Sequence, residues 1–249
     1  MKYNLTQPFF VKEGAIKMKA ISKWKEKSYL KDKFNNCIVN IMRFDSEKDM
    51  ETLENVSKKK VRFNNYIENL HSKQYLADNT LNNMSIHEDI YKDLYNPYLN
   101  GPIKENPKKI VLFIGENTKS GCHIHIEQDW VLHQIVGKKI VYLLPFEELE
   151  IKPLYKFNQA NFSKKNFFKL DKSKYNIQKI ELNPGDMLYI PPWTWHAIEN
   201  IGYTIAVTKV FERDLDYLKL KKYRKIKHRV YISKFIETIQ KLLRKITFN

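Results

Sequence analysis

The 249-residue chain contains few glycines, cysteines and acidic residues. It has 7 glycines and two cysteines, Cys37 and Cys122, which lie far apart and form no CxxC pair. This pattern excludes a disulfide framework and a zinc-finger spacing. No stretch approaches the roughly 18 consecutive apolar residues of a membrane-spanning helix, and the N-terminal residues lack a continuous signal-peptide core. We therefore expect an intracellular, cytoplasmic protein that does not enter a membrane.

The scarcity of acidic residues leaves the chain strongly basic. Lysine and arginine number 44 against 28 aspartates and glutamates, a formal charge of +16 at pH 7. Such a charge favours contact with polyanions such as nucleic acids, although a solvated lysine-rich surface produces the same balance. Hydrophobic residues make up 43% of the sequence, enough for a sizeable core.

Residue patterns divide the chain into a mixed N-terminal part, a β-rich part and a helical tail. Apolar spacing indicates a helix within residues 20–34, and a strand is expected at 37–44. The segment 58–81 is expected to form a strand or turn followed by a helix. From residue 108 onward, short apolar runs alternate with Gly and Pro turns, which is typical of an antiparallel sandwich or barrel.

The C-terminal tail changes in composition. Apolar residues recur at helical spacing in residues 232–246, directly after a basic cluster at 219–229. We expect an amphipathic helix that packs on the domain or on a second copy of the chain, as in a homodimer. The basic cluster is either an anion-binding patch or a solvated face.

The stretch HIHIEQDW places four metal-binding residue types at alternate positions. In a continuous strand His123, His125, Glu127 and Asp129 would face the same side. Two histidines and one carboxylate occupy one face of an octahedral iron(II) ion and leave three positions open. The pair His125 and Glu127 offers the first two ligands, and His196, at the end of PGDMLYIPPWTWH, is the candidate third.

These motifs resemble the cupin-like branch of the JmjC hydroxylases, which are iron(II)- and 2-oxoglutarate-dependent oxygenases. The family includes factor-inhibiting-HIF-type asparaginyl hydroxylases and a tRNA wybutosine hydroxylase. The resemblance rests on GCHIHIE, QIVGKK and NPGDMLYIPPWTWH, and extends over residues 6–211. It implies a mainly β fold with α additions, namely a double-stranded β-helix (jelly-roll, cupin) core with N-terminal helices and a C-terminal helical tail. We expect a domain at 1–211, with an α/β addition at 1–107 and the core at 108–211, and a basic tail at 212–249.

The resemblance also assigns roles to individual residues. It implies that His125, Glu127 and His196 bind the iron and are the catalytic set. Lys139 would pair with the distal carboxylate of 2-oxoglutarate, and Tyr75 would hydrogen-bond to the same group. Residues at further co-substrate positions of the motifs are Cys122, where the family often has Thr, Gln134, and Thr208, where Asn is more usual.

Alternatives remain open on both the ligands and the substrate. His123, His125, Asp129 and His196 resemble the four-ligand set of non-oxygenase cupins, and a structural role as hydrogen-bonded core groups would need no metal. The resemblance favours a hydroxylase that acts on a protein side chain, whereas the basic tail keeps an RNA substrate as an alternative. A catalytically silent metal-binding cupin is the third hypothesis.

Overall fold

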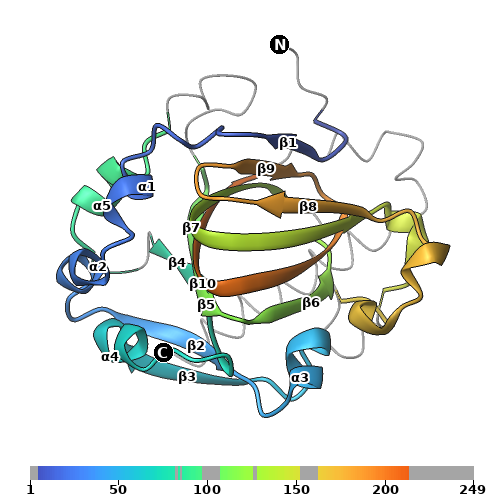
Figure 1. Cartoon of the computed structure of the whole chain (residues 1–249), viewed down its shortest axis with the longest axis horizontal. Helices are drawn as coiled ribbons and strands as arrows, with labels where there is room; N and C mark the ends of the chain where they lie inside the picture. The colour runs from blue at the N-terminus through green and yellow to red at the C-terminus, as the bar shows by residue number, and fades with distance from the viewer. Residues whose placement is uncertain are drawn as a thin grey trace, which may run out of the picture.

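The computed structural model describes residues 5–81, 84, 86–96, 107–125, 128–151 and 162–212. The expected basic cluster and amphipathic helix of the tail lie outside these residues. Within them, ten strands form one hydrogen-bonded antiparallel network (Figure 1). The strands are β1 Phe9–Val11, β2 Ile38–Arg43, β3 Ser57–Arg62, β4 Gln74–Thr80, β5 Lys109–Glu116, β6 Lys119–His123, β7 Gln128–Leu144, β8 Gln178–Leu182, β9 Met187–Ile190 and β10 Trp195–Glu212.

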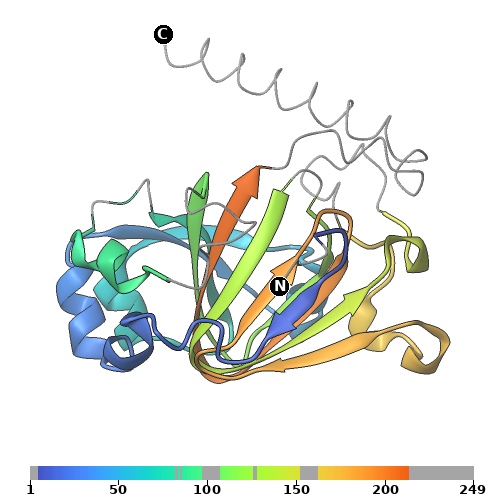
Figure 2. The ribbon, with the colours of Figure 1, turned by 90° about the horizontal axis from the view of Figure 1, so that it is seen from above.

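Two long strands, β7 and β10, pair along their length and bend at the same place. Their register runs from Trp195 opposite Leu144 to Glu212 opposite Gln128, and it shifts between Ile201 and Ile205. Gly137 in β7 and Gly202 in β10 both have left-handed backbone, with φ of +70° and +65°. The two halves of this strand pair therefore belong to different layers, which Figure 2 shows as two sheets spreading from a shared bend.

The two layers are the sheets of a jelly roll. The larger sheet consists of the N-terminal half of β7 and the C-terminal half of β10, with β9, β1, β5, β4, β2 and β3 beside them. The remaining halves pair with β8 on one side and β6 on the other and make the smaller sheet. Figure 1 shows β8, β7, β10 and β6 in this order. The fold is the expected mainly β, cupin-like jelly roll with helical additions.

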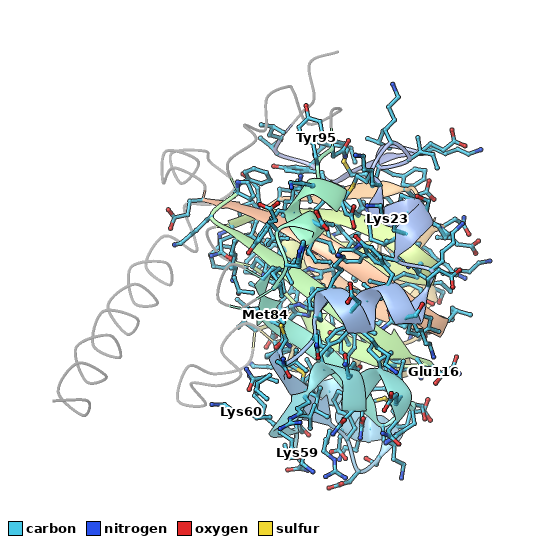
Figure 3. The ribbon with its side chains drawn as sticks, turned by 90° about the vertical axis from the view of Figure 1, so that its left-hand side faces the viewer. Lys23, Lys59, Lys60, Met84, Tyr95 and Glu116 are labelled. Carbon is cyan, nitrogen blue, oxygen red and sulfur yellow. The ribbon has the colours of Figure 1, made fainter. Side chains whose placement is uncertain are left out.

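Short helices cover the outer face of the larger sheet (Figure 3). The core between these helices and the larger sheet contains Trp24, Phe34 and Phe63 from the helical side and Leu112 and Ile205 from the sheet. These helices are α1 Ala20–Lys23, α2 Lys27–Lys33, α4 Phe63–Glu68 and α5 Asp89–Asp93. A further helix, α3 Glu47–Thr52, packs beside β6, and 3-10 turns lie at Phe146–Glu148, Phe167–Lys169 and Lys172–Lys174. None of the helices among the described residues is long and apolar enough to cross a bilayer.

The N-terminal elements follow the sequence pattern with one difference. The strand expected at 37–44 is β2, and the strand and helix expected within 58–81 are β3 and α4, followed by β4. The single helix expected within residues 20–34 is two helices, because the backbone of Glu26 is extended (φ −83°, ψ 108°) and separates α1 from α2. This break allows both Trp24 and Phe34 to reach the core, where their rings pack edge to face.

Alternation along the strands of the smaller sheet separates an inner from an outer face. Val141 and Leu143 point inward and pack with Leu188 from the larger sheet. Tyr142 and Leu144 point outward and pack with other apolar side chains. Side chains on the inner faces of the two sheets therefore meet in the space between them.

The bend predicts a matched pair of glycine substitutions. A Cβ at Gly137 would lie 2.0 Å from the carbonyl oxygen of Tyr203, whereas a Cβ at Gly202 would meet nothing within 4 Å. Both positions carry the strain of left-handed backbone, on the order of 1–2 kcal/mol for a residue with a side chain. We expect Gly202→Ala to cost about that much, and Gly137→Ala to cost at least about 2 kcal/mol more because the backbone must move. Urea unfolding measures both; equal losses would contradict the proposed packing at the bend.

Candidate functional site

A cavity of about 220 Å³ lies between the inner faces of the two sheets. Residues from both sheets line it, so it depends on the two layers facing each other. Its polar lining includes three histidines, one lysine and three hydroxyl-bearing residues, set among apolar side chains. The lining residues are Met42, Leu53, Tyr75, Ala77, Phe113, Ser120, His123, Ile124, His125, Trp130, Leu132, Lys139, Phe162, Ile190, His196, Ile198 and Thr208.

Three histidines gather in this cavity. His123 is the last residue of β6, His125 follows it, and His196 is the second residue of β10 and the register partner of His123. One ligand nitrogen from each lies within 4.8 Å of the other two. The centroids of the rings of His123 and His196 are 4.1 Å apart, and those of His125 and His196 are 4.9 Å apart.

Backbone carbonyls fix the orientation of two of these rings. Nδ1 of His123 donates to Gly121 O (2.8 Å), and Nδ1 of His196 donates to Thr194 O (3.0 Å). A carbonyl can only accept, so each ring in its neutral form carries its proton on Nδ1 and its lone pair on Nε2. Metal-binding histidines are commonly held in this way by a partner on the other ring nitrogen.

The environment keeps the imidazoles of His125 and His196 neutral. Burial lowers the pKa of His125, and the nearby rings of His196 and His123 lower it further. Burial, followed by the proximity of His123, likewise lowers the pKa of His196. Neutral imidazoles have a lone pair to donate, which a metal site requires.

His125 provides a test of whether the cluster suits a metal. Its ring stacks on Trp130 with centroids 3.7 Å apart, and its carbonyl accepts from the backbone N–H of Trp193 (2.8 Å). Its Nε2 is buried and has no hydrogen-bond partner among the described residues. A buried polar atom of this kind costs free energy that a bound cation would offset. The residues present therefore fit a divalent metal ion.

Lys139 contributes a buried amine to the same cavity. It lies on the inner face of β7 just beyond the bend, is 1% exposed, and its Nζ lies 5.5 Å from the centroid of the Phe113 ring. Burial lowers its pKa from 10.5 to about 7. An anion in the cavity would favour the charged form and raise this pKa again. The amine is therefore suited to bind a carboxylate.

Tyr75 and Thr208 line the cavity from the larger sheet. Tyr75 lies on β4, and its ring packs against that of Phe113, 6.2 Å away. The hydroxyl of Tyr66 donates to Ile114 O (2.6 Å) and accepts from the N–H of Leu76 (3.0 Å), which ties β4 to β5 next to Tyr75. The structure thus brings His125, His196, Lys139, Tyr75 and Thr208, all expected from the sequence, to one cavity.

Two residues that the sequence analysis assigned to the co-substrate do not line the cavity. Cys122 points to the outer side of the smaller sheet and packs with Tyr142 and Trp195, because neighbours in a strand face opposite ways. The side-chain NH2 of Gln134 donates to Val136 O (2.8 Å) and Gly137 O (3.0 Å), and so supports the bend. Neither side chain lines the cavity, and a contact of either with the co-substrate remains a prediction.

Of the two acidic ligand candidates, Asp129 is separated from the three histidines and Glu127 lies outside the described residues. Glu127 falls in residues 126–127, which are outside the described residues. Asp129 accepts a hydrogen bond from the hydroxyl of Tyr189 (2.6 Å) and does not line the cavity. The expected uniform alternation from His123 to Asp129 is wrong, because β6 ends at His123 and β7 begins at Gln128. The four-ligand set with Asp129 is not assembled.

The other three histidines among the described residues do not line the cavity. His133 is fully buried, and its Nδ1 donates to Val207 O (3.2 Å), while His71 and His87 are exposed.

Ser120 and Phe162 line the cavity but no sequence motif identified them. Their place depends on the pairing of β6 with β10 and on a bridge between His123 and Phe162.

Comparisons with known proteins agree with the jelly-roll fold. Residues 3–217 match the family described as the cupin-like domain. The lysine-specific demethylase JMJ30 of Arabidopsis thaliana is 31% identical over 85 residues, which are 31% of this chain and 20% of the demethylase. A structure of E. coli ycfD superposes with a TM-score of 0.56 at 14% identity, and covers 84% of this chain and 50% of that one. A second, titled as the E. coli ribosomal oxygenase YcfD, gives 0.51 at 14% identity over 86% and 50%.

The structural neighbours show likeness of fold. The chain spans half the length of these structures and 20% of the demethylase.

The buried amine predicts a stability change when Lys139 is replaced by methionine. Between pH 7 and 10.5 the unfolded chain binds the proton that the folded chain has lost, so Lys139 lowers stability most at and below pH 7. We expect Lys139→Met to raise the free energy of unfolding by on the order of 3 kcal/mol at pH 7, with a smaller gain at pH 10. Lys138→Met, at a neighbouring side chain that is 44% exposed, is the control and should change little. Urea unfolding at several pH values measures both; a Lys139→Met variant less stable at pH 7 would contradict the burial of a costly amine.

Proposed function

Because the chain belongs to the cupin-like domain family, we propose that it is an iron(II)- and 2-oxoglutarate-dependent hydroxylase acting on a macromolecule. The observation that carries the proposal is the shared cavity: neutral imidazoles and a buried amine line the same space of about 220 Å³. A metal site alone would explain the histidines, but it would leave the burial of Lys139 without a purpose. A dicarboxylate chelated to the metal accounts for both.

In this proposal His125 and His196 hold the iron together with Glu127, whose ligand role comes from the sequence motif. When bound, the iron and 2-oxoglutarate together supply the oxidant for hydroxylation of a C–H bond. The chain fixes the direction of the His196 ring through Thr194 O and that of His125 through its stacking on Trp130. These contacts limit the positions from which a substrate can approach the metal.

Lys139 binds the far carboxylate of 2-oxoglutarate. Its amine takes up a proton when the anion enters, and the resulting pair is a charge-assisted hydrogen bond in an apolar setting. Tyr75 and Thr208 offer hydroxyl donors from the opposite sheet to the same co-substrate. Apolar neighbours such as Phe113, Leu132 and Ile190 exclude water around it.

The names of the similar proteins favour a macromolecular substrate. One is a lysine-specific demethylase, which acts on a protein side chain, and another is a ribosomal oxygenase. We propose a protein side chain as the substrate of this chain. The RNA alternative depends on the basic cluster at 219–229, which lies outside the described residues.

Turnover of 2-oxoglutarate to succinate with Fe(II) in air tests the reaction. We expect wild-type protein to consume 2-oxoglutarate, and His125→Ala and His196→Ala to lose that activity because each removes a metal ligand. Substitution of the exposed His71 by alanine is the control and should leave the rate unchanged. Absence of turnover together with absence of 2-oxoglutarate binding in wild-type protein would overturn the proposal in favour of a silent metal-binding cupin.

The role of Lys139 has a test of its own. Loss of one hydrogen bond between charged groups is worth about 1.5–3 kcal/mol, so Lys139→Met should weaken 2-oxoglutarate binding roughly 10- to 100-fold. Calorimetry with Fe(II) under nitrogen measures the dissociation constant. Lys138→Met, which removes an exposed amine next to it, should bind as the wild type does. If Lys139→Met also kept wild-type affinity, the carboxylate would bind elsewhere.

A further inference from the structure

The inner face of the larger sheet stays exposed at β2 and β3. Side chains alternate along β2, so Val39 and Ile41 are buried under the helices, whereas Ile38 and Met42 lie on the inner side. Met42 lines the cavity, but Ile38 is 54% exposed. The smaller sheet therefore leaves the far end of this face open to solvent.

β3 adds three cations to the open part of the face, one opposite each inner-facing residue of β2. The pairs are Lys58 with Met42, Lys60 with Asn40 and Arg62 with Ile38. Residues directly opposite each other in an antiparallel pair point to the same face. All three cationic side chains are exposed, and Figure 3 shows Lys60 at the margin of the molecule formed by β3. We call Lys58, Lys60 and Arg62, together with Ile38 and Asn40, the basic face.

We propose that the basic face binds an extended, acidic segment of protein, which is the substrate whose side chain enters the cavity. The inference rests on the proposed function and gives the chemistry of its protein substrate. Alternate residues of a strand are about 6.8 Å apart, in β3 and in an extended peptide alike. Carboxylates at every second position of a bound segment therefore match the three cations one to one.

Acidic side chains of the described residues do not neutralise the basic face. Helix α3 connects β2 to β3, and its Glu47 and Glu51 pair with Lys119 (2.6 and 2.9 Å). Its Asp49 accepts from the N–H of Ser46 (3.0 Å) and completes a capping box. No ion pair within the described part of the chain includes a basic side chain of β3. A ligand of opposite charge therefore complements this face.

The basic face leads to the cavity across neighbouring strands. Met42 of β2 is the register partner of Lys58 on one side and of Tyr75 of β4 on the other. The spacing of strands puts Tyr75 about 10 Å from Lys58. Met42 and Tyr75 both line the cavity. Three extended residues, about 10 Å long, therefore connect a carboxylate bound at Lys58 with the cavity.

The chemistry of the basic face favours a peptide over RNA. Proteins bind single-stranded nucleic acid by stacking its bases on exposed aromatic side chains. The large exposed aromatic residues within the described ranges are Phe10, Tyr91 and Tyr95, which lie on β1 and on or beside α5. The basic face instead offers the apolar side chain of Ile38 next to its cations, which suits a segment with both acidic and apolar residues.

Lysines on an edge strand also have a protective explanation. Edge strands commonly carry charges that prevent pairing with another chain, and β3 is the last strand of the larger sheet among the described residues. Protection needs charge on the strand, but it does not need charges aligned on the face that continues into the cavity. The two explanations therefore predict different binding of an acidic peptide.

Fluorescence anisotropy of a labelled peptide tests the proposal. The probe has about ten residues, with glutamate alternating with threonine, so that its extended form carries the charges on one side. It is titrated with the full chain, without iron or 2-oxoglutarate, at an ionic strength of about 50 mM. The variant Lys58→Gln, Lys60→Gln, Arg62→Gln should bind roughly 5- to 50-fold more weakly than wild type, because each exposed ion pair contributes a factor of about 1.5 to 5.

A matched control removes the same charge elsewhere. The variant Lys12→Gln, Lys19→Gln, Lys25→Gln replaces three exposed lysines between β1 and α2, and should bind within about twofold of wild type. A charge-conserving variant, Lys58→Arg, Lys60→Arg, Arg62→Lys, should keep wild-type affinity. Thermal unfolding verifies that each variant is folded. A loss confined to the variant that removes the charges of β3 supports the proposal.

Three results would overturn it. They are no binding of the peptide by wild type, equal loss in the two glutamine variants, and tighter binding of an oligouridylate of matched charge that is lost with the charges of β3. The last result would assign the basic face to nucleic acid. Because the titrations contain no iron, they are independent of the turnover test. Failure of turnover would remove the hydroxylase and leave the peptide affinity unchanged, whereas failure of peptide binding would leave a hydroxylase with a different substrate.

Discussion

The bend shared by β7 and β10 is the constraint on which the rest of the molecule depends. It makes one long antiparallel strand pair part of two facing sheets, and it requires left-handed backbone at Gly137, where a side chain would meet Tyr203 O. Gln134 holds the bend through two backbone carbonyls, and Lys139 follows it on the inner face. The motif formed by Gln134, Gly137 and Lys139 therefore combines two residues that shape the backbone with one that faces the cavity. Without the bend, the amine would not lie opposite the other sheet.

Burial of polar groups in the cavity lowers the free energy of unfolding of the protein. The amine of Lys139 is desolvated, and Nε2 of His125 is buried without a partner among the described residues. Each would be better solvated in the unfolded chain. The surrounding apolar layers supply the free energy that offsets this burial. A cation would satisfy Nε2 of His125, and a carboxylate would satisfy the amine of Lys139. A metal that binds a chelating dicarboxylate supplies both.

The backbone around the histidines has a second function, which is to set ring direction. Carbonyls at Gly121 and Thr194 take the Nδ1 protons of His123 and His196, and burial with mutual proximity keeps His125 and His196 neutral. The site is thus prepared for a cation before one is present. Since β6 contributes its last residue and β10 its second, the meeting of these rings depends on strand pairing between segments about 70 residues apart in the sequence.

The sequence by itself determined the strand-rich pattern, the family resemblance, and the residue types at His125, His196, Lys139, Tyr75 and Thr208, because local periodicity and short motifs carry that information. It could not tell that Cys122 faces outward or that Gln134 supports the backbone, since facing depends on where each strand begins and how it pairs. Uniform alternation through HIHIEQDW was the natural expectation, but β6 ends at His123 and β7 begins at Gln128. Only the tertiary structure decided that His123 joins the cluster and Asp129 does not, because register between distant strands fixes which side chains meet.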